Sequence, residues 1–139
     1  MTGEMNKRYL AVVQGVVSDA GESNTPVHAK GSMKPALTKC RPLTSNGCTS
    51  LVELDLITGR RHQLRRQLAE AGWPIIGDDR YHQKSTLKSG RLLLHCCFLA
   101  FPDPVNGNLV EIDCPLPESF VTAVKELGSA TRGLLEFLP

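Results

Sequence analysis

Alternating apolar and polar residues predict most of a β-sheet. In SLVELDLI, residues 50–57, Val and Leu side chains alternate with Glu53 and Asp55, the period of two of a strand with one face on a core. YLAVVQGVV, residues 9–17, is almost continuously apolar and predicts a strand buried on both faces. RLLLHCCFLAF, residues 91–101, and NLVEIDC, residues 108–114, flank an Asn-Gly turn signal and predict an antiparallel hairpin.

Two other segments have helical spacing. After a Thr-Gly pair, Leu64 and Leu68 fall on one apolar stripe, and a glycine and a proline beyond them predict the end of the helix. Residues 118–127 predict a second short amphipathic helix. Residues 18–50 are rich in Gly, Ser, Asn, Pro and Thr, which predicts loops with one or two short strands, one of them near residues 36–40.

These elements predict an α+β protein with a mainly antiparallel sheet and a few flanking helices, because strands outnumber helices and regular crossover helices are missing. The length of 139 residues predicts a single domain, and 41% hydrophobic against 22% charged residues is typical of soluble globular proteins. No apolar run approaches the roughly 20 residues that span a bilayer. We therefore expect an intracellular protein without membrane contact; the cytoplasm is favoured, with the nucleus and organelles as alternatives. The sequence leaves the oligomeric state open, and a monomer is favoured.

Cysteine and histidine positions argue against a metal site. The cysteines lie at residues 40, 48, 96, 97 and 114, without the two-residue gap of a zinc ribbon or a thioredoxin-type pair. We predict no metal and expect the cysteines to be small buried side chains. His95 is expected to be a hydrogen-bonded core residue, whereas His28 is expected in solvent and His82 follows a turn.

The basic residues cluster in one segment, although the net charge of the whole chain is small. A formal net charge of +2 is too small to indicate a polyanionic partner. However, Arg60, Arg61, His62, Arg65 and Arg66 lie within seven residues at the predicted start of the first helix. Each cation near a helix N-terminus is unfavourable by about 0.3–1 kcal/mol, so we expect an anion to compensate these charges.

The sequence leaves two interpretations of this cluster open. In the first, the arginines form a solvated basic face paired with nearby acidic residues, an arrangement that contributes little to stability. In the second, the arginines and the helix N–H groups bind a phosphate or a catalytic carboxylate. At roughly 100° per residue, Arg61 and Arg65 lie on one edge of the apolar stripe, whereas His62 and Arg66 point away from it.

A long motif around this cluster resembles a known family. LITGRRHQLRRQLAEAGWPIIGDDRY, residues 56–81, is similar to the signature of RluA-type RNA pseudouridine synthases, TGR-x-HQ-hydrophobic-R followed by G-x-P-I-x-GD-x-x-Y. KRYLAVVQG, residues 7–15, resembles their Lys-x-Tyr-x-Ala strand, and LLLHCCFLAFPDP, residues 92–104, resembles their LHA-containing strand. KPALTKC, residues 34–40, is a weaker match, and the resemblance covers about residues 7–117.

The resemblance implies isomerisation of uridine to pseudouridine in ribosomal or transfer RNA. Uracil is detached from C1′ of its ribose, turned and rejoined through C5, with no metal or organic cofactor. Arg65 corresponds to the arginine that binds the catalytic aspartate, and Tyr9 to the tyrosine that stacks on the extruded base and helps to take the C5 proton. The other basic residues are expected to contact structured RNA or to support the site: Arg60, Arg61, His62 and Arg66.

One part of the family pattern is missing from the printed sequence. The family's catalytic aspartate lies in a His-Arg-Leu-Asp type motif upstream of the tyrosine, and the 139 residues contain no such motif. We therefore expect residues 1–139 to be part of a catalytic domain, inactive alone. The alternatives are a non-catalytic RNA-binding paralogue or assembly module, and a fragment that does not fold alone. Asp78 and Asp79 are expected to form a structural turn, Trp73 to pack, and Tyr81 to lie outside the site.

Overall fold

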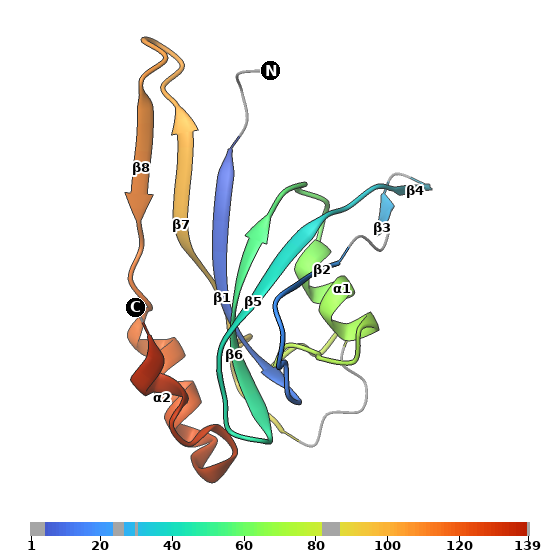
Figure 1. Ribbon diagram of the computed structural model, residues 1–139, viewed down its shortest axis with the longest axis vertical. Helices are drawn as coiled ribbons and strands as arrows, with labels where there is room; N and C mark the ends of the chain where they lie inside the picture. The colour runs from blue at the N-terminus through green and yellow to red at the C-terminus, as the bar shows by residue number, and fades with distance from the viewer. Residues whose placement is uncertain (1–4, 24–26, 30, 82–86, 139) are drawn as a thin grey trace.

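A six-stranded antiparallel sheet is the centre of the computed structural model, which describes residues 5–23, 27–29, 31–81 and 87–138 (Figure 1). The strand order is β2-β5-β6-β1-β7-β8. The strands are β1 (Asn6–Gln14), β2 (Gly21–Ser23), β5 (Thr38–Ser45), β6 (Thr49–Leu56), β7 (Leu94–Pro102) and β8 (Leu109–Asp113). A separate two-stranded hairpin pairs β3 (Val27–Ala29) with β4 (Ser32–Lys34).

Each face of the sheet carries its own hydrophobic core. On one face lies α1 (Gln63–Glu70), and on the other lie α2 (Glu118–Glu126) and the 3₁₀ turns η1 (Gly128–Thr131) and η2 (Leu134–Phe137). Alternate residues of a strand point to opposite faces. The α1 core therefore takes Ala11 and Val13 from β1, whereas the α2 core takes Val12. This arrangement confirms the predicted α+β class with a mainly antiparallel sheet.

The strand predictions hold best where the hydrophobic pattern is regular. β6 and the β7–β8 hairpin lie where they were expected. The first strand starts earlier than the predicted 9–17 segment and ends at Gln14, because Gly15 turns the chain with a φ of 102°. The prediction of loops over residues 18–50 is wrong in extent: this part includes the eight-residue β5. Its Pro42 lies at a register shift, a position that tolerates proline.

The first helix begins later than expected, whereas α2 begins where predicted. α1 starts at Gln63, so Arg60, Arg61 and His62 precede the helix instead of forming its first turn. His62 adopts a left-handed backbone conformation with a φ of 53°, and none of the described side chains caps the helix. The directions of the Arg60, Arg61 and His62 side chains therefore cannot be predicted from helical geometry.

The expected burial of cysteine and histidine is wrong. Cys40, Cys96 and Cys97 are only half-buried, Cys48 and Cys114 are exposed, and all five are free thiols. His95 is half-buried rather than in the core, although its Nε2 lies 3.0 Å from the Cys114 carbonyl oxygen. The expectations for the His28 side chain and for His82 fall outside what the structure describes.

The described residues contain neither a candidate membrane-spanning helix nor a candidate metal site. Neither helix in this part of the chain is long and apolar enough to cross a membrane. No three His, Cys, Asp or Glu side chains gather there in a way that suits a metal ion.

Candidate functional site

Two buried glutamines fix α1 to the sheet. Gln63 and Gln67 are each 2% exposed. The Gln63 amide donates to the Leu37 carbonyl and the Thr38 hydroxyl at 3.0 and 2.8 Å, and its Oε1 accepts from the Thr58 hydroxyl at 2.6 Å. Buried polar groups need such partners. The Thr and Gln of the TGR-x-HQ motif therefore shape the loop that leads into α1.

The same network continues one helical turn later. Gln67 accepts a hydrogen bond from the Thr38 hydroxyl at 2.7 Å and donates to the Ala36 carbonyl at 3.1 Å. Leu64 and Leu68 pack beside these contacts in the α1 core. The position and rotation of α1 relative to β5 are thus set by paired polar groups as well as by apolar packing.

A tight turn after α1 is fixed to β1. Ile75 and Ile76 are fully buried, and the Ile76 N–H donates to the Val12 carbonyl at 3.0 Å. Gly77 follows with a φ of 87°, and a Cβ there would collide with the Arg91 carbonyl. Only glycine suits this position. The GD turn therefore sits at a fixed place under α1.

Arg65 and Asp78 join α1 to this turn through a bidentate ion pair. Arg65 Nε donates to Asp78 Oδ2 at 3.0 Å and Nη2 donates to Oδ1 at 2.8 Å. The Asp78 side chain is 1% exposed, and that of Arg65 is 20% exposed. The backbone N–H groups of Arg80 and Tyr81 also donate to Asp78 Oδ1, each at 3.0 Å. Burial favours the neutral acid, but these hydrogen bonds outweigh it and lower the pKa of Asp78 below its ordinary value.

The structure corrects the assignment of Tyr81, which lies at the centre of the basic cluster. The guanidinium carbons of Arg65, Arg66 and Arg80 lie 5.2, 5.7 and 5.7 Å from its ring centroid. Arg66 Nε donates to the Tyr81 hydroxyl at 3.2 Å, and His62 Nδ1 lies 2.9 Å from the same oxygen. Cations within about 6 Å of a ring are attracted to its face. Tyr81 therefore belongs to the basic cluster, and the spacing GD-x-x-Y was the available signal.

The expected division of the cluster is also wrong. His62 and Arg66 were expected to point away from the apolar stripe toward solvent, but both reach the tyrosine that Arg65 contacts. Partial burial, and then the surrounding arginines, lower the pKa of His62 below its ordinary value. At neutral pH His62 is therefore uncharged, which suits a hydrogen bond with the Tyr81 hydroxyl.

Arg60 and Arg61 lie at the outer side of the cluster. Both are exposed, and Arg60 Nε donates to the Pro35 carbonyl at 2.9 Å. Arg61 is close enough to contribute to the lowered pKa of His62. These two arginines are therefore placed to meet a partner from solvent, in contrast to the enclosed Arg65.

Tyr9 lies on the face of the sheet that α1 covers. It is half-buried against the α1 core, and a register shift lies between Arg8 and Tyr9 in the pairing with β7. Bulges of this kind redirect a side chain. Burial, and then Cys96, raise the pKa of Tyr9 above its ordinary value. No hydrogen bond links Tyr9 to Arg65 within the described residues, so the two predicted catalytic residues share a face without touching through polar atoms.

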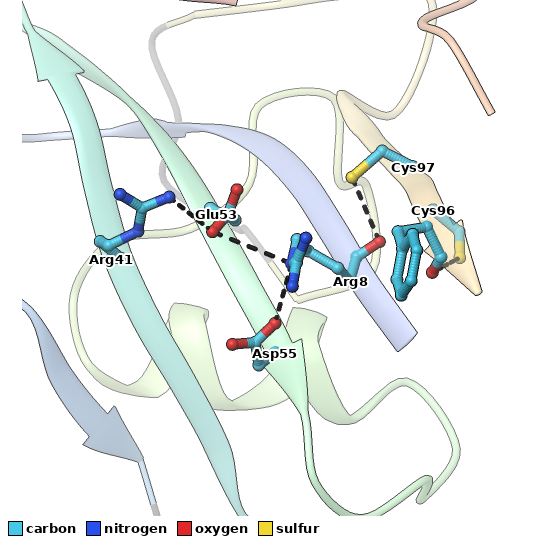
Figure 2. Close-up of polar contacts among 7 residues, drawn as sticks. Arg8, Arg41, Glu53, Asp55, Cys96 and Cys97 are labelled. Atoms are coloured by element: carbon cyan, nitrogen blue, oxygen red, sulfur yellow. Dashed lines mark hydrogen bonds and ion pairs between the residues drawn. The ribbon is translucent and has the colours of Figure 1, made fainter. Parts of the chain in front are cut away.

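A second charged group occupies the opposite face (Figure 2). Arg8 Nε lies 3.2 Å from Asp55 and 3.9 Å from Glu53, which also pairs with Arg41 at 2.7 Å. Asp55 is about half-exposed, as expected of a solvent-facing strand residue. Since neighbouring residues of a strand face opposite ways, this network is separated from Tyr9 by the sheet itself.

Comparison with known proteins matches this arrangement to one family. The family model described as RNA pseudouridylate synthase matches residues 2–70. An uncharacterized RNA pseudouridine synthase of Bacillus subtilis, YlyB, is 31% identical over 88% of this chain and 44% of its own length. Ribosomal large subunit pseudouridine synthase C of Escherichia coli is 30% identical over 91% of this chain and 46% of its own length. The chain belongs to the RluA-type RNA pseudouridine synthase family.

Structural comparison supports the membership of this RluA-type chain. The solved structure of human RNA pseudouridylate synthase domain containing 4 aligns with a TM-score of 0.71 and 26% identity, over 88% of this chain and 62% of that one. The chain spans about half the length of the curated relatives it matches. The match to the family model includes Tyr9 and Arg65, whereas Asp78 and Tyr81 lie beyond it.

Proposed function

We propose that this chain is part of an enzyme that isomerises uridine to pseudouridine in ribosomal or transfer RNA, without a cofactor. The observation that carries the proposal is the state of Arg65, which occupies the family's arginine position. Its guanidinium is fixed by Asp78 through two of its five N–H donors. Among the described residues its other three donors make no hydrogen bond, and they would bind the carboxylate of a catalytic aspartate from outside the printed residues.

Tyr9 is proposed as the residue that stacks on the extruded uracil. Its raised pKa keeps the phenol neutral at physiological pH. A neutral phenol is a poor base, so the environment favours stacking over unassisted removal of the C5 proton. The half-buried position on the α1 face supports this role, because a base stacked there is shielded from water.

The basic cluster is proposed as the RNA contact. Arg65, Arg66 and Arg80 surround Tyr81 while Asp78 supplies one fully buried negative charge, which leaves the cluster positively charged. Such an excess attracts phosphate and makes binding salt-dependent. The proposed RNA-contacting or supporting residues are Arg60, Arg61, His62 and Arg66.

The test compares catalysis with RNA binding in the full-length natural protein. Pseudouridine formed in ribosomal and transfer RNA is measured beside the dissociation constant at several salt concentrations. Arg65→Ala is expected to lower kcat by at least about 10³-fold, on the scale of losing a pre-organised charged group, while RNA affinity falls far less. Arg66→Ala is expected chiefly to weaken binding and to reduce the salt slope by about one. Equal losses of kcat and affinity in Arg65→Ala would contradict its assignment.

A non-catalytic RNA-binding protein is the second candidate. The observation that favours it is the ion pair itself, since Asp78 already gives Arg65 a carboxylate partner, and the printed residues contain no His-Arg-Leu-Asp motif. The intact mass of the protein isolated from its native cell separates the two. A mass near 15.2 kDa with RNA binding and no pseudouridine formation supports the second candidate, whereas a larger mass with an upstream Arg-Leu-Asp peptide supports the enzyme.

A further inference from the structure

We propose that Tyr81 is a positioning residue that holds the Arg65 guanidinium at a fixed angle, so that its outer edge is presented to a second carboxylate. This inference rests on the proposed function. It concerns a residue that neither the sequence prediction nor the match over residues 2–70 assigns.

The hydrogen bonds of Arg65 to Asp78 leave one edge of the guanidinium, formed by Nη1 and Nη2, without a partner among the described residues. Asp78 occupies Nε and one N–H of Nη2, so the second N–H of Nη2 and both of Nη1 remain. Within the described residues, Nη1 of Arg65 makes no hydrogen bond. Guanidinium binds a carboxylate in parallel pairs of N–H bonds, and the remaining edge has the geometry for a second such pair. Arg65 is therefore built to bridge two carboxylates.

An ion pair alone does not fix the plane of the guanidinium. A bidentate contact with Asp78 still permits tilting about the axis that joins the two groups. The ring of Tyr81, 5.2 Å from the Arg65 guanidinium carbon, lies against it as a third contact. A planar cation against an aromatic ring is restrained in that remaining direction. Orientation of this kind matters because a displacement of about 1 Å can cost on the order of 10²-fold in rate.

The ring itself is held at both ends. Its backbone N–H donates to Asp78 Oδ1, and its hydroxyl contacts Arg66 Nε and His62 Nδ1. The phenol is therefore tied to α1 and to the loop before it, while its main chain is tied to the carboxylate that binds Arg65. The contacts of Tyr81 therefore join the two halves of the motif, TGR-x-HQ-x-R and GD-x-x-Y.

The first part of the test measures the order of the Arg65 side chain directly and does not require pseudouridine formation. Arginine Nε–Hε signals are recorded by NMR for the full chain, with Arg65→Lys used to assign the Arg65 signal. Tyr81→Leu is expected to raise the water-exchange rate of the Arg65 Hε proton by about tenfold, the size of a lost cation–π contact. Tyr81→Phe keeps the ring and is expected to stay within about threefold of the unchanged protein. Equal rates in Tyr81→Leu and the unchanged protein would overturn the proposal.

The second arm measures catalysis in the full-length natural protein. Tyr81→Leu is expected to lower kcat by about tenfold while the RNA dissociation constant changes less than about twofold. Asp79→Asn removes an exposed neighbouring carboxylate and serves as the control with unchanged kcat. A loss of affinity as large as the loss of kcat would show that Tyr81 binds RNA instead, and would contradict a positioning role. If the unchanged protein forms no pseudouridine, the proposed function fails, and the NMR arm still decides whether Tyr81 orders Arg65.

Discussion

Removing the Arg65 guanidinium gives the sharpest test of how the site is built. Arg65→Met keeps the apolar stem of the side chain and leaves the Asp78 carboxylate, 1% exposed, without its cation. Breaking a buried ion pair in this way costs about 3–5 kcal/mol. Two backbone N–H groups still donate to Asp78, and Arg65 is 20% exposed, so we expect the low end, about 3 kcal/mol. Asp78→Asn in the same chain removes the stranded charge and keeps an acceptor for those N–H groups.

The assay is a double-mutant cycle by urea unfolding of the 139-residue chain at neutral pH. We expect a coupling energy of about 2 kcal/mol, with Arg65→Met/Asp78→Asn more stable than Arg65→Met alone. For a domain of this size, the loss of 3 kcal/mol lowers Tm by about 10 °C. Arg61→Met, at an exposed position, is the control and is expected to change stability by less than about 0.5 kcal/mol. A coupling energy below about 0.5 kcal/mol would refute the reasoning. The absence of any cooperative transition in the unchanged chain would show that it does not fold alone.

Three further predictions follow from the same contacts. Gly77→Ala is expected to lower the free energy of unfolding by more than about 3 kcal/mol in urea, because the added Cβ meets the Arg91 carbonyl. Gly72→Ala is the control: Gly72 has a similar φ of 93° but open space around it, so a loss of about 1 kcal/mol is expected. The lowered pKa of Asp78 stabilises the fold above about pH 4, the ordinary pKa of an aspartate, and this contribution is lost as pH falls through the lower folded-state pKa. Acid unfolding curves of Asp78→Asn should therefore be flatter below about pH 4. Gln67→Met leaves the Thr38 hydroxyl and the Ala36 carbonyl without the hydrogen bonds to Gln67, and it is expected to lower the free energy of unfolding by about 1–3 kcal/mol. An unchanged Tm in thermal unfolding would contradict the role given to the Gln67 amide.

The predictable part of the fold is the part with a regular hydrophobic period. β6 alternates along its length, and α2 repeats its apolar residues at helical spacing, so both were located closely. β5 was predicted only as a short strand near residues 36–40, because the rest of its sequence, TKCRPLTS, has the composition of a loop. It is a strand because β6 and β2 pair with its two edges and α1 hydrogen-bonds to its start at Thr38. These contacts are non-local, and a local pattern does not contain them.

The site shows a similar division between local and non-local information. The resemblance implied that Arg65 binds the carboxylate of a catalytic aspartate, and in the structure its guanidinium is paired with a different carboxylate, that of Asp78. The prediction that Asp78 serves only a turn was incomplete, because the same oxygen accepts from the turn and from Arg65. Tyr81 was missed since its contacts arise where the turn after the helix folds back on α1. Helical geometry gives the direction of a side chain only within the helix.

The contacts also explain why so long a motif contains so few groups for chemistry. Thr58, Gln63 and Gln67 are fully engaged in joining α1 to β5, and Asp78 is enclosed under the helix. These residues hold the local shape of the chain, and none of their contacts depends on the nucleophile. A motif match therefore establishes membership in the family more strongly than it establishes catalysis. The enzyme differs from a binding protein in the group that pairs with the outer edge of the Arg65 guanidinium, formed by Nη1 and Nη2. The Tyr81 variants test whether the contacts of Tyr81 with Arg65, Arg66 and His62 keep that edge in place.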